Sequence, residues 1–272
     1  MMAQVRPSFL LGRYSNVGWW YYFPITFLLK TPIVTLIAMG AALWFSLRRR
    51  ETWILLFLLL PVGLYVISSM SVHINIGHRH LLPIYPFLYV LSGGLVVEWR
   101  KQNSKVRKPL AAASLLAMAI GSLIVFAPPW RPQWVYPHYL SYFNELAGGP
   151  RQGYRRLVDS NLDWGQDLKS LRTWLTQRGI TEPINLCYFG TADPHYYGIV
   201  HLSLPGNYLF EKPIDFNQAR VPGYAAISAT NLQVARFQPQ GRAAWADFLS
   251  HAKLVDTVGY SIFIYQVGSR SN

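Results

Sequence analysis

The sequence predicts an α-helical integral membrane domain of about four transmembrane helices, followed by a small α/β extracytoplasmic domain. Apolar residues make up 51% of the 272 residues and charged residues only 14%, which is unusual for a soluble protein. The apolar residues concentrate in the first half, whereas helix-like and strand-like patterns alternate in the second. We therefore expect an external interfacial segment over 1–30, a membrane domain over 31–128 and an extracytoplasmic domain over 129–272.

Four runs without acidic or basic residues are long enough, or nearly so, to cross a hydrocarbon core of roughly 30 Å. They predict membrane helices over about 31–47, 52–70, 81–98 and 109–127. Pro61 interrupts the second helix and Pro83 lies at the start of the third. Because proline removes a backbone donor, each of these helices has a carbonyl that another group must satisfy.

The basic residues lie in alternate loops of this membrane domain. Arg48 to Arg50 separate the first two runs, and five basic residues over 100–108 separate the last two. Short loops rich in Lys and Arg stay in the cytoplasm, so we expect a multi-pass protein of the inner membrane with its C-terminal domain on the periplasmic or extracellular side. The net charge of +13 belongs mainly to these loops, and nucleic acid is not an expected partner.

The first 30 residues contain five consecutive aromatic residues, Trp19 to Phe23, which predict an interfacial belt. Lys30 follows, with its ammonium either at the membrane surface or facing a cavity. No signal peptide precedes the first run. An external N-terminus without an export signal suggests that further membrane helices once preceded it.

The second half has the pattern of a mixed domain. Helices are predicted over 138–149, from Asp163 to Arg178, and over 242–252, and strands over 183–190, 223–230 and 256–267. Leu168, Leu171, Trp174 and Leu175 lie at helical spacing and predict a buried face. The single Cys187 excludes an intramolecular disulfide and a cysteine-based zinc site, and we expect it to be buried.

The loop "SVHINIGHRH", residues 71–80, gathers His73, Asn75, His78, Arg79 and His80 between the second and third predicted helices. It is either a wet interfacial loop whose Arg pairs with lipid headgroups or a site for a phosphate group, which the guanidinium fork fits. A metal site is disfavoured, because the loop offers no carboxylate.

The stretch "DSNLDWGQDL", residues 159–168, is rich in acid and has three interpretations. As a calcium loop it lacks Gly at position 6, which is Trp164, and Glu at position 12, which is Ser170. As a helix start it uses Asp163 as N-cap, with Gln166 completing a capping box and Asp167 in the first turn. Three residues are left over for an acceptor or glycan contact: Asp159, Asn161 and Trp164. The sequence predicts no cofactor with certainty, and a divalent cation is the one candidate cofactor.

Three segments read "GWWYYFPITFLLKTP", "GHRHLLPIYPFLYVLSG" and "YLSYFNELAGGPRQGYRRLVDSNLDWGQDLKSLRTWL". Together they resemble the C-terminal portion of bacterial membrane glycosyltransferases of the GT-C type, relatives of protein O-mannosyltransferases and lipid A aminoarabinose transferases. The resemblance implies part of a many-helix bundle, a polyprenyl-phosphate sugar as donor, and transfer to an acceptor outside the cytoplasm.

In such enzymes a catalytic acid lies in an external loop near the N-terminus, and no segment here matches that loop. We therefore assign no catalytic residue and expect little activity from this chain alone. The donor phosphate is expected at Arg79, with Lys30 and His78 or His80 as helpers. The implied partners are the lipid-linked sugar donor, membrane lipids and a missing N-terminal half.

Two other function classes stay open at this stage. A transporter or flippase fragment also explains proline-broken helices and the intramembrane Lys30. A non-catalytic membrane scaffold could bind glycan or protein through the Trp and Tyr residues of its outer domain.

Overall fold

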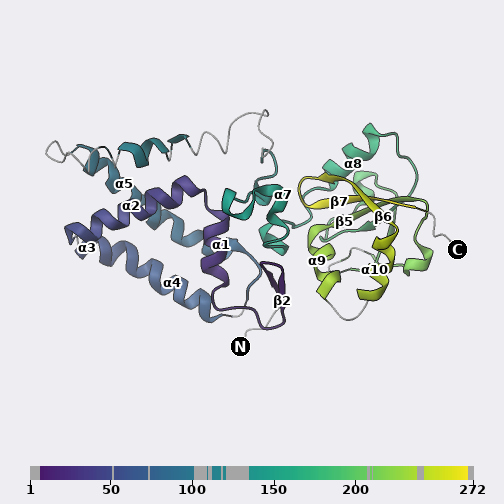
Figure 1. Cartoon of the computed structure of the whole chain (residues 1–272), viewed down its shortest axis with the longest axis horizontal. Helices are drawn as coiled ribbons and strands as arrows, with labels where there is room; N and C mark the ends of the chain where they lie inside the picture. The colour runs from purple at the N-terminus through teal and green to yellow at the C-terminus, as the bar shows by residue number, and fades with distance from the viewer. Residues whose placement is uncertain are drawn as a thin grey trace. The chain divides into compact units, whose positions relative to one another are not determined.

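The computed structural model describes residues 7–50, 52–72, 74–100, 135–206, 211–237 and 242–268, with 109, 112–117, 119–120 and 209 (Figure 1). The chain forms two compact units: the first is Met1–Ser8 with Ser15–Pro150, the second Phe9–Tyr14 with Arg151–Asn272. The longer segment of the second unit begins at Arg151, and the sequence analysis placed the start of the extracytoplasmic domain at 129. The predicted fourth membrane helix, 109–127, lies largely outside the described residues.

The first unit is mainly helical. Its helical elements in chain order are α1 (Tyr22–Lys30), α2 (Ile33–Arg49), α3 (Thr52–Ile54), the π-helical turn η1 (Leu55–Leu59), α4 (Leu60–Ser71), the 3-10 helix η2 (His78–Ile84) and α5 (Tyr85–Arg100). The strands β1 (Ser8–Leu10) and β2 (Arg13–Ser15) form a two-stranded sheet that precedes these helices in the chain, and residues 9–14 of it belong to the second unit.

Helix α1 is a feature that the sequence analysis did not predict, since residues 1–30 were assigned to an interfacial segment. It runs into α2 through a bend of 113°. Pro32 causes the break because its ring disfavours the α conformation at the residue before it, and Thr31 is extended with φ −91° and ψ 134°.

Within the part of the chain that the structure describes, two helical stretches are long and apolar enough to cross a membrane by length and composition, Thr52–Ser71 and His78–Val97. The bent pair α1 and α2 makes a third if it counts as one span. The expectation that Pro61 interrupts the second helix is corrected, because α3, η1 and α4 run on as one helix from Thr52 to Ser71. The π-helical turn just before Pro61 widens the backbone where the proline cannot donate a hydrogen bond.

Helices α2 and α5 form the core of the first unit. Ala38 and Ala42 of α2 allow a close approach, and Phe45 packs with Leu91 and Leu95 of α5. By contrast, no residue of the most apolar part of Thr52–Ser71 is buried. This helix exposes a broad apolar surface, which a water-solvated protein rarely does.

The predicted helix over 138–149 is wrong: the structure has two short 3-10 turns, η3 (Tyr139–Ser141) and η4 (Glu145–Ala147). Asn144 explains the break. Its side-chain amide donates to the carbonyls of Leu28, and of Thr31 at 2.7 Å, and its backbone N–H donates to Leu29 at 3.0 Å. The carbonyls at the end of a helix have no partner within it, so this segment gives up its own helix to satisfy those of α1.

The second unit is a mixed five-stranded sheet with helices on both faces. Its elements include α7 (Pro150–Gly153), η5 (Asp159–Asn161), α8 (Leu168–Gln177), β3 (Ile184–Cys187), η6 (His195–Tyr197), β4 (His201–Ser203), η7 (Phe216–Gln218), β5 (Gly223–Ser228), α9 (Ala229–Phe237), α10 (Arg242–Ser250), β6 (Ala252–Val258) and β7 (Ile262–Val267). The strand order is β4-β3-β5-β7-β6, with β3 parallel to β4 and β5 and the other pairs antiparallel.

The face that α8 covers is the main core of this unit. The four residues predicted at helical spacing, Leu168, Leu171, Trp174 and Leu175, are all buried. They pack on strand residues that alternate toward them, such as Ile184 and Leu186 of β3. Figure 1 shows α8 on one side of the sheet and α9 and α10 on the other. Strands are confirmed in the predicted regions 183–190 and 223–230, and Cys187 is buried as predicted. The region 256–267 was predicted as one strand but contains the end of β6, a turn and β7, and β4 and α9 were not predicted.

Candidate functional site

The first unit gathers polar side chains where α1, η2 and α5 meet. His78 Nε2 and the Tyr85 hydroxyl are hydrogen-bonded at 2.8 Å, and that hydroxyl also bonds to Thr31 Oγ1. Lys30, the last residue of α1, donates to the Leu140 carbonyl at 2.8 Å, with its ammonium 4.2 Å from the centre of the Phe143 ring. We call these residues, with Arg79 and His80, the polar cluster.

The remaining members of the polar cluster come from η2. Arg79 is exposed, and the His80 ring packs edge-on against Phe23 with their centres 6.2 Å apart. His80 Nε2 is buried and has no hydrogen-bond partner among the described residues. A buried polar atom left in this way requires an explanation, and a bound ligand is one of the few available.

An apolar cavity of about 450 Å³ lies beside the polar cluster. Its wall includes Phe23 and Phe27 of α1, Met39 of α2, and Leu81 and Ile84 of η2. Phe23 is the ring that His80 contacts, and the Phe27 ring lies 5.6 Å from that of Tyr85. The polar cluster is therefore separated from the cavity by single aromatic rings. Such an arrangement can hold a molecule with an anionic head and an apolar tail.

In the second unit, the stretch 159–168 is not a helix start, and the predicted capping box is wrong. Helix α8 begins at Leu168, and its N-cap Asp167 makes no capping hydrogen bond through its side chain. The reason is Gly165, whose φ of +77° breaks the helix, and where a Cβ would collide with the Tyr188 hydroxyl. Instead, Asp163 Oδ1 accepts from the Gly165 N–H at 3.2 Å, and Gln166 Oε1 accepts from the Trp164 N–H at 2.8 Å.

Two carboxyl groups of this stretch are buried in the second unit. Asp167 accepts from the Ser261 hydroxyl at 2.6 Å and from the Gln166 amide at 3.1 Å. Burial raises the pKa of Asp163 from 3.8 to about 8, so this side chain is a neutral carboxylic acid at pH 7. The hydrogen bonds of these two carboxyl groups organise the loop from the inside, although Asp163 Oδ2 is buried and makes no hydrogen bond among the described residues.

The three residues proposed for acceptor or glycan contact do not share one environment. Asp159 is half-buried with φ +57°, and its N–H donates to Thr230 Oγ1 at 3.0 Å. Asn161 is buried and donates to the Val158 carbonyl at 3.1 Å. Trp164 is 51% exposed, with its ring edge toward Phe189. Of the three, Trp164 is the one that a glycan in solution can reach broadly.

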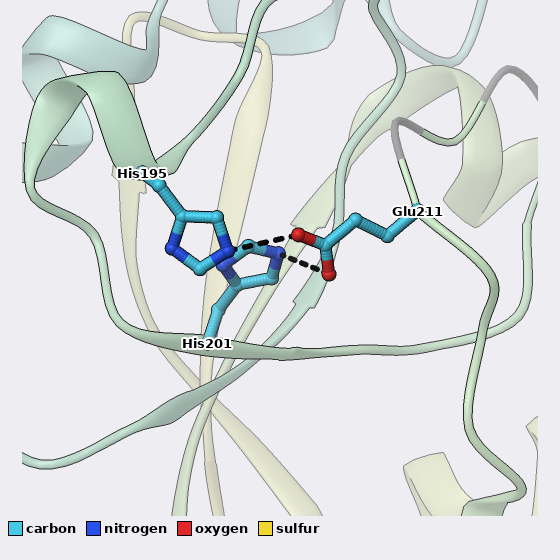
Figure 2. Close-up of side chains that lie close together, drawn as sticks. All are labelled: His195, His201 and Glu211. Carbon is cyan, nitrogen blue, oxygen red and sulfur yellow. Dashed lines mark hydrogen bonds and ion pairs between the residues drawn. The ribbon is translucent and has the colours of Figure 1, made fainter.

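A third cluster was not found from the sequence, which assigned no metal ligands. Figure 2 shows His195, His201 and Glu211 pointing toward one another, with dashed lines from Glu211 to each imidazole. Their nitrogen and oxygen atoms all lie within 4.8 Å of one another. Among the described residues, these three are the His, Cys, Asp or Glu side chains that lie close enough together to bind one metal ion. The acidic residues of 159–167 do not form such a group. The sequence feature that could have indicated this cluster is a pair of histidines on either side of a turn, but their spacing to Glu211 matches no known metal-binding motif.

Comparisons with models of protein families, with curated proteins and with solved structures found no match to this chain.

Proposed function

We propose that the first unit binds the phosphate and the adjoining hydrocarbon of a polyprenyl-phosphate sugar, as part of a membrane glycosyltransferase that moves the sugar to an extracytoplasmic acceptor. The observation that carries this proposal is the apolar cavity of about 450 Å³ beside the polar cluster. Its volume lies within the range of ligand pockets, and its wall has the apolar character that an isoprenoid chain needs.

The headgroup end of the proposed ligand is matched by the groups of η2. The Arg79 guanidinium offers a planar fork of donors suited to phosphate oxygens, and it is exposed where a lipid-linked phosphate can reach it. The buried His80 Nε2 is a further polar atom for the same headgroup. Lys30 is held by the Leu140 carbonyl and adds positive charge beside it.

In the proposed reaction these groups act on the leaving phosphate. When a sugar departs from a polyprenyl phosphate, negative charge develops on the phosphate oxygens. Cationic donors that are already positioned lower the energy of that transition state without reorganising. The hydrogen-bonded chain of Thr31, Tyr85 and His78 fixes the orientation of the imidazole that borders the site.

Binding of polyprenyl phosphate to the full chain in lipid nanodiscs tests this proposal. Arg79→Ala removes the charge-assisted hydrogen bonds, so we expect its Kd to rise by roughly 10-fold to 100-fold. The matched control is Arg48→Ala, which removes an exposed guanidinium near the far end of α2, roughly 25 Å along the helix from Thr31. We expect Arg48→Ala to bind like the wild type.

A second comparison separates the head from the tail. Polyprenol, which lacks the phosphate, should bind more weakly than polyprenyl phosphate and should not distinguish Arg79→Ala from the wild type. Equal affinity of wild type and Arg79→Ala for polyprenyl phosphate contradicts the proposed phosphate site.

A further inference from the structure

The cluster of His195, His201 and Glu211 combines residues from three neighbouring segments of the second unit. His195 lies on η6, His201 begins the edge strand β4, and Glu211 lies in the segment that follows β4. His195 Nε2 lies 2.8 Å from Glu211 Oε1, and His201 Nε2 lies 3.7 Å from Glu211 Oε2. One carboxylate therefore faces two imidazoles, a combination of ligand types that borderline metal ions favour.

The His201 ring is oriented so that its Nε2 atom faces the Glu211 carboxylate. Its Nδ1 lies 3.3 Å from the Ile199 carbonyl. A carbonyl can only accept, so the ring proton is on Nδ1 in a neutral His201 and Nε2 carries a lone pair. This lone pair faces the negative oxygen of Glu211, which is unfavourable unless a proton or a metal ion lies between them. Metal-binding histidines commonly donate their other N–H to a backbone carbonyl in this way.

We propose that His195, His201 and Glu211 bind one Zn²⁺ ion, with a fourth coordination position open to water or to an anionic group. Zinc bonds to nitrogen and oxygen ligands are about 2.0 to 2.2 Å long, which places the ligand atoms of a tetrahedral site roughly 3.3 Å apart. The observed separations of 2.8 and 3.7 Å lie on either side of this value.

The fold fixes one ligand and leaves two adjustable. The His201 side chain is 2% exposed, whereas those of His195 and Glu211 are 53% and 37% exposed and can move to close on an ion. The backbone around His195 is held by a short turn, in which the Gly198 N–H donates to the His195 carbonyl at 2.8 Å and the Ile199 N–H donates to Pro194 at 3.1 Å. On binding, the proton between His195 and Glu211 moves to His195 Nδ1 or to solvent, and the metal takes its place.

The ion would tie the turn, the edge strand and the following segment together. Strand β4 has only three residues and pairs on one side only, with β3. If zinc binds only the folded form, it stabilises that form by mass action. Zinc should therefore raise the temperature at which the β4 edge of the sheet unfolds. The site lies outside the polar cluster and does not depend on the function proposed for the first unit.

Titration of the metal-stripped full chain with Zn²⁺ tests the site, using a preparation without a histidine tag. Isothermal calorimetry should give one site that His195→Ala and Glu211→Gln each weaken by roughly 100-fold or more. Both residues are partly exposed, so neither variant should unfold the unit, and circular dichroism checks this. The matched control is His251→Ala, an exposed histidine of the same unit, which should bind like the wild type.

The histidines of the first unit are the competing source of zinc binding. A His78→Ala, His80→Ala double variant should keep the high-affinity site if the ion sits at His195, His201 and Glu211. Co²⁺ in place of Zn²⁺ should give the strong visible absorption of four-coordinate cobalt, and His195→Ala should abolish it. Zinc affinity that survives both His195→Ala and Glu211→Gln, or that disappears in the double variant of the first unit, overturns the proposal, as does an absence of binding to the wild type.

Discussion

Helix α8 of the second unit and helix α4 of the first unit differ in whether their apolar residues are buried. In the second unit, Leu171 and Leu175 of α8 lie fully inside a core. In the first unit, Leu64 and Ile67 of α4 are 60% and 64% exposed. Residue types that are equally apolar thus lie inside one unit and outside the other. From this difference we propose that the two units face different solvents, with hydrocarbon covering the exposed apolar surface of the first.

The polar side chains differ in the same sense. The second unit buries many of them, including Asp163, Asp167 and Asn185, and each of these three makes at least one hydrogen bond within the fold. In the first unit, the polar cluster lies at the junction of α1, η2 and α5, beside an apolar cavity. Polar groups in the second unit thus organise loops, whereas those of the first unit are arranged where a ligand could use them.

One leucine truncation in each unit tests this comparison with the largest expected effect. Leu171→Ala removes a fully buried side chain, so we expect the free energy of unfolding of the second unit to fall by about 3 kcal/mol. Leu64→Ala should change the stability of the first unit by less than about 1 kcal/mol, because lipid chains solvate Ala and Leu alike. Hydrogen exchange of the full chain in nanodiscs measures both. A large loss for Leu64→Ala would show that α4 has a protein environment.

A smaller effect is expected from the buried carboxyl group of Asp163. Its pKa is about 8 in the folded protein against an ordinary 3.8, so between these pH values the folded form keeps a proton that the unfolded form has lost. This group therefore makes the second unit less stable as pH rises from about 4 to 8. Asp163→Asn removes the titration, and we expect it to raise the free energy of unfolding at pH 8 by on the order of 2 kcal/mol.

The matched control is Asp247→Asn, the same change at an exposed site on α10. Unfolding of the second unit, followed by hydrogen exchange of β3 and β5 across this pH range, should show a flatter pH dependence for Asp163→Asn only. An unchanged slope would mean that Asp163 is ionised inside the fold.

The spacing of apolar residues in the sequence was enough to predict the elements whose buried residues recur at helical or strand spacing. The buried face of α8 could be predicted because Leu168, Leu171 and Trp174 recur at helical spacing. Helix α1 was missed because its aromatic residues are also those of an interfacial belt. The turns around Asn144 were predicted as a helix because its bonds to the carbonyls of α1 are made over more than a hundred residues of sequence.

The candidate sites divide in the same way. Arg79, His78 and His80 could be named as candidates from the sequence because they are adjacent in it, and the structure places all three in η2. The capping box at Asp163 failed because the left-handed Gly165 is fixed by its contact with Tyr188, which no local pattern contains. The cluster of His195, His201 and Glu211 exists only once the turn and the edge strand are in place.

The contrast between the two units is tested most directly by measuring whether lipid or water surrounds one exposed position in each unit. A cysteine carrying a fluorescent label replaces Ile67 of α4 in one variant and Val255 of β6, 41% exposed, in another. The native Cys187 does not compete, because it is fully buried and burial raises the pKa of its thiol. In nanodiscs, lipids brominated in their acyl chains should quench the label at Ile67 and spare the label at Val255, and aqueous iodide should do the reverse. Iodide quenching as strong at Ile67 as at Val255 would contradict the account.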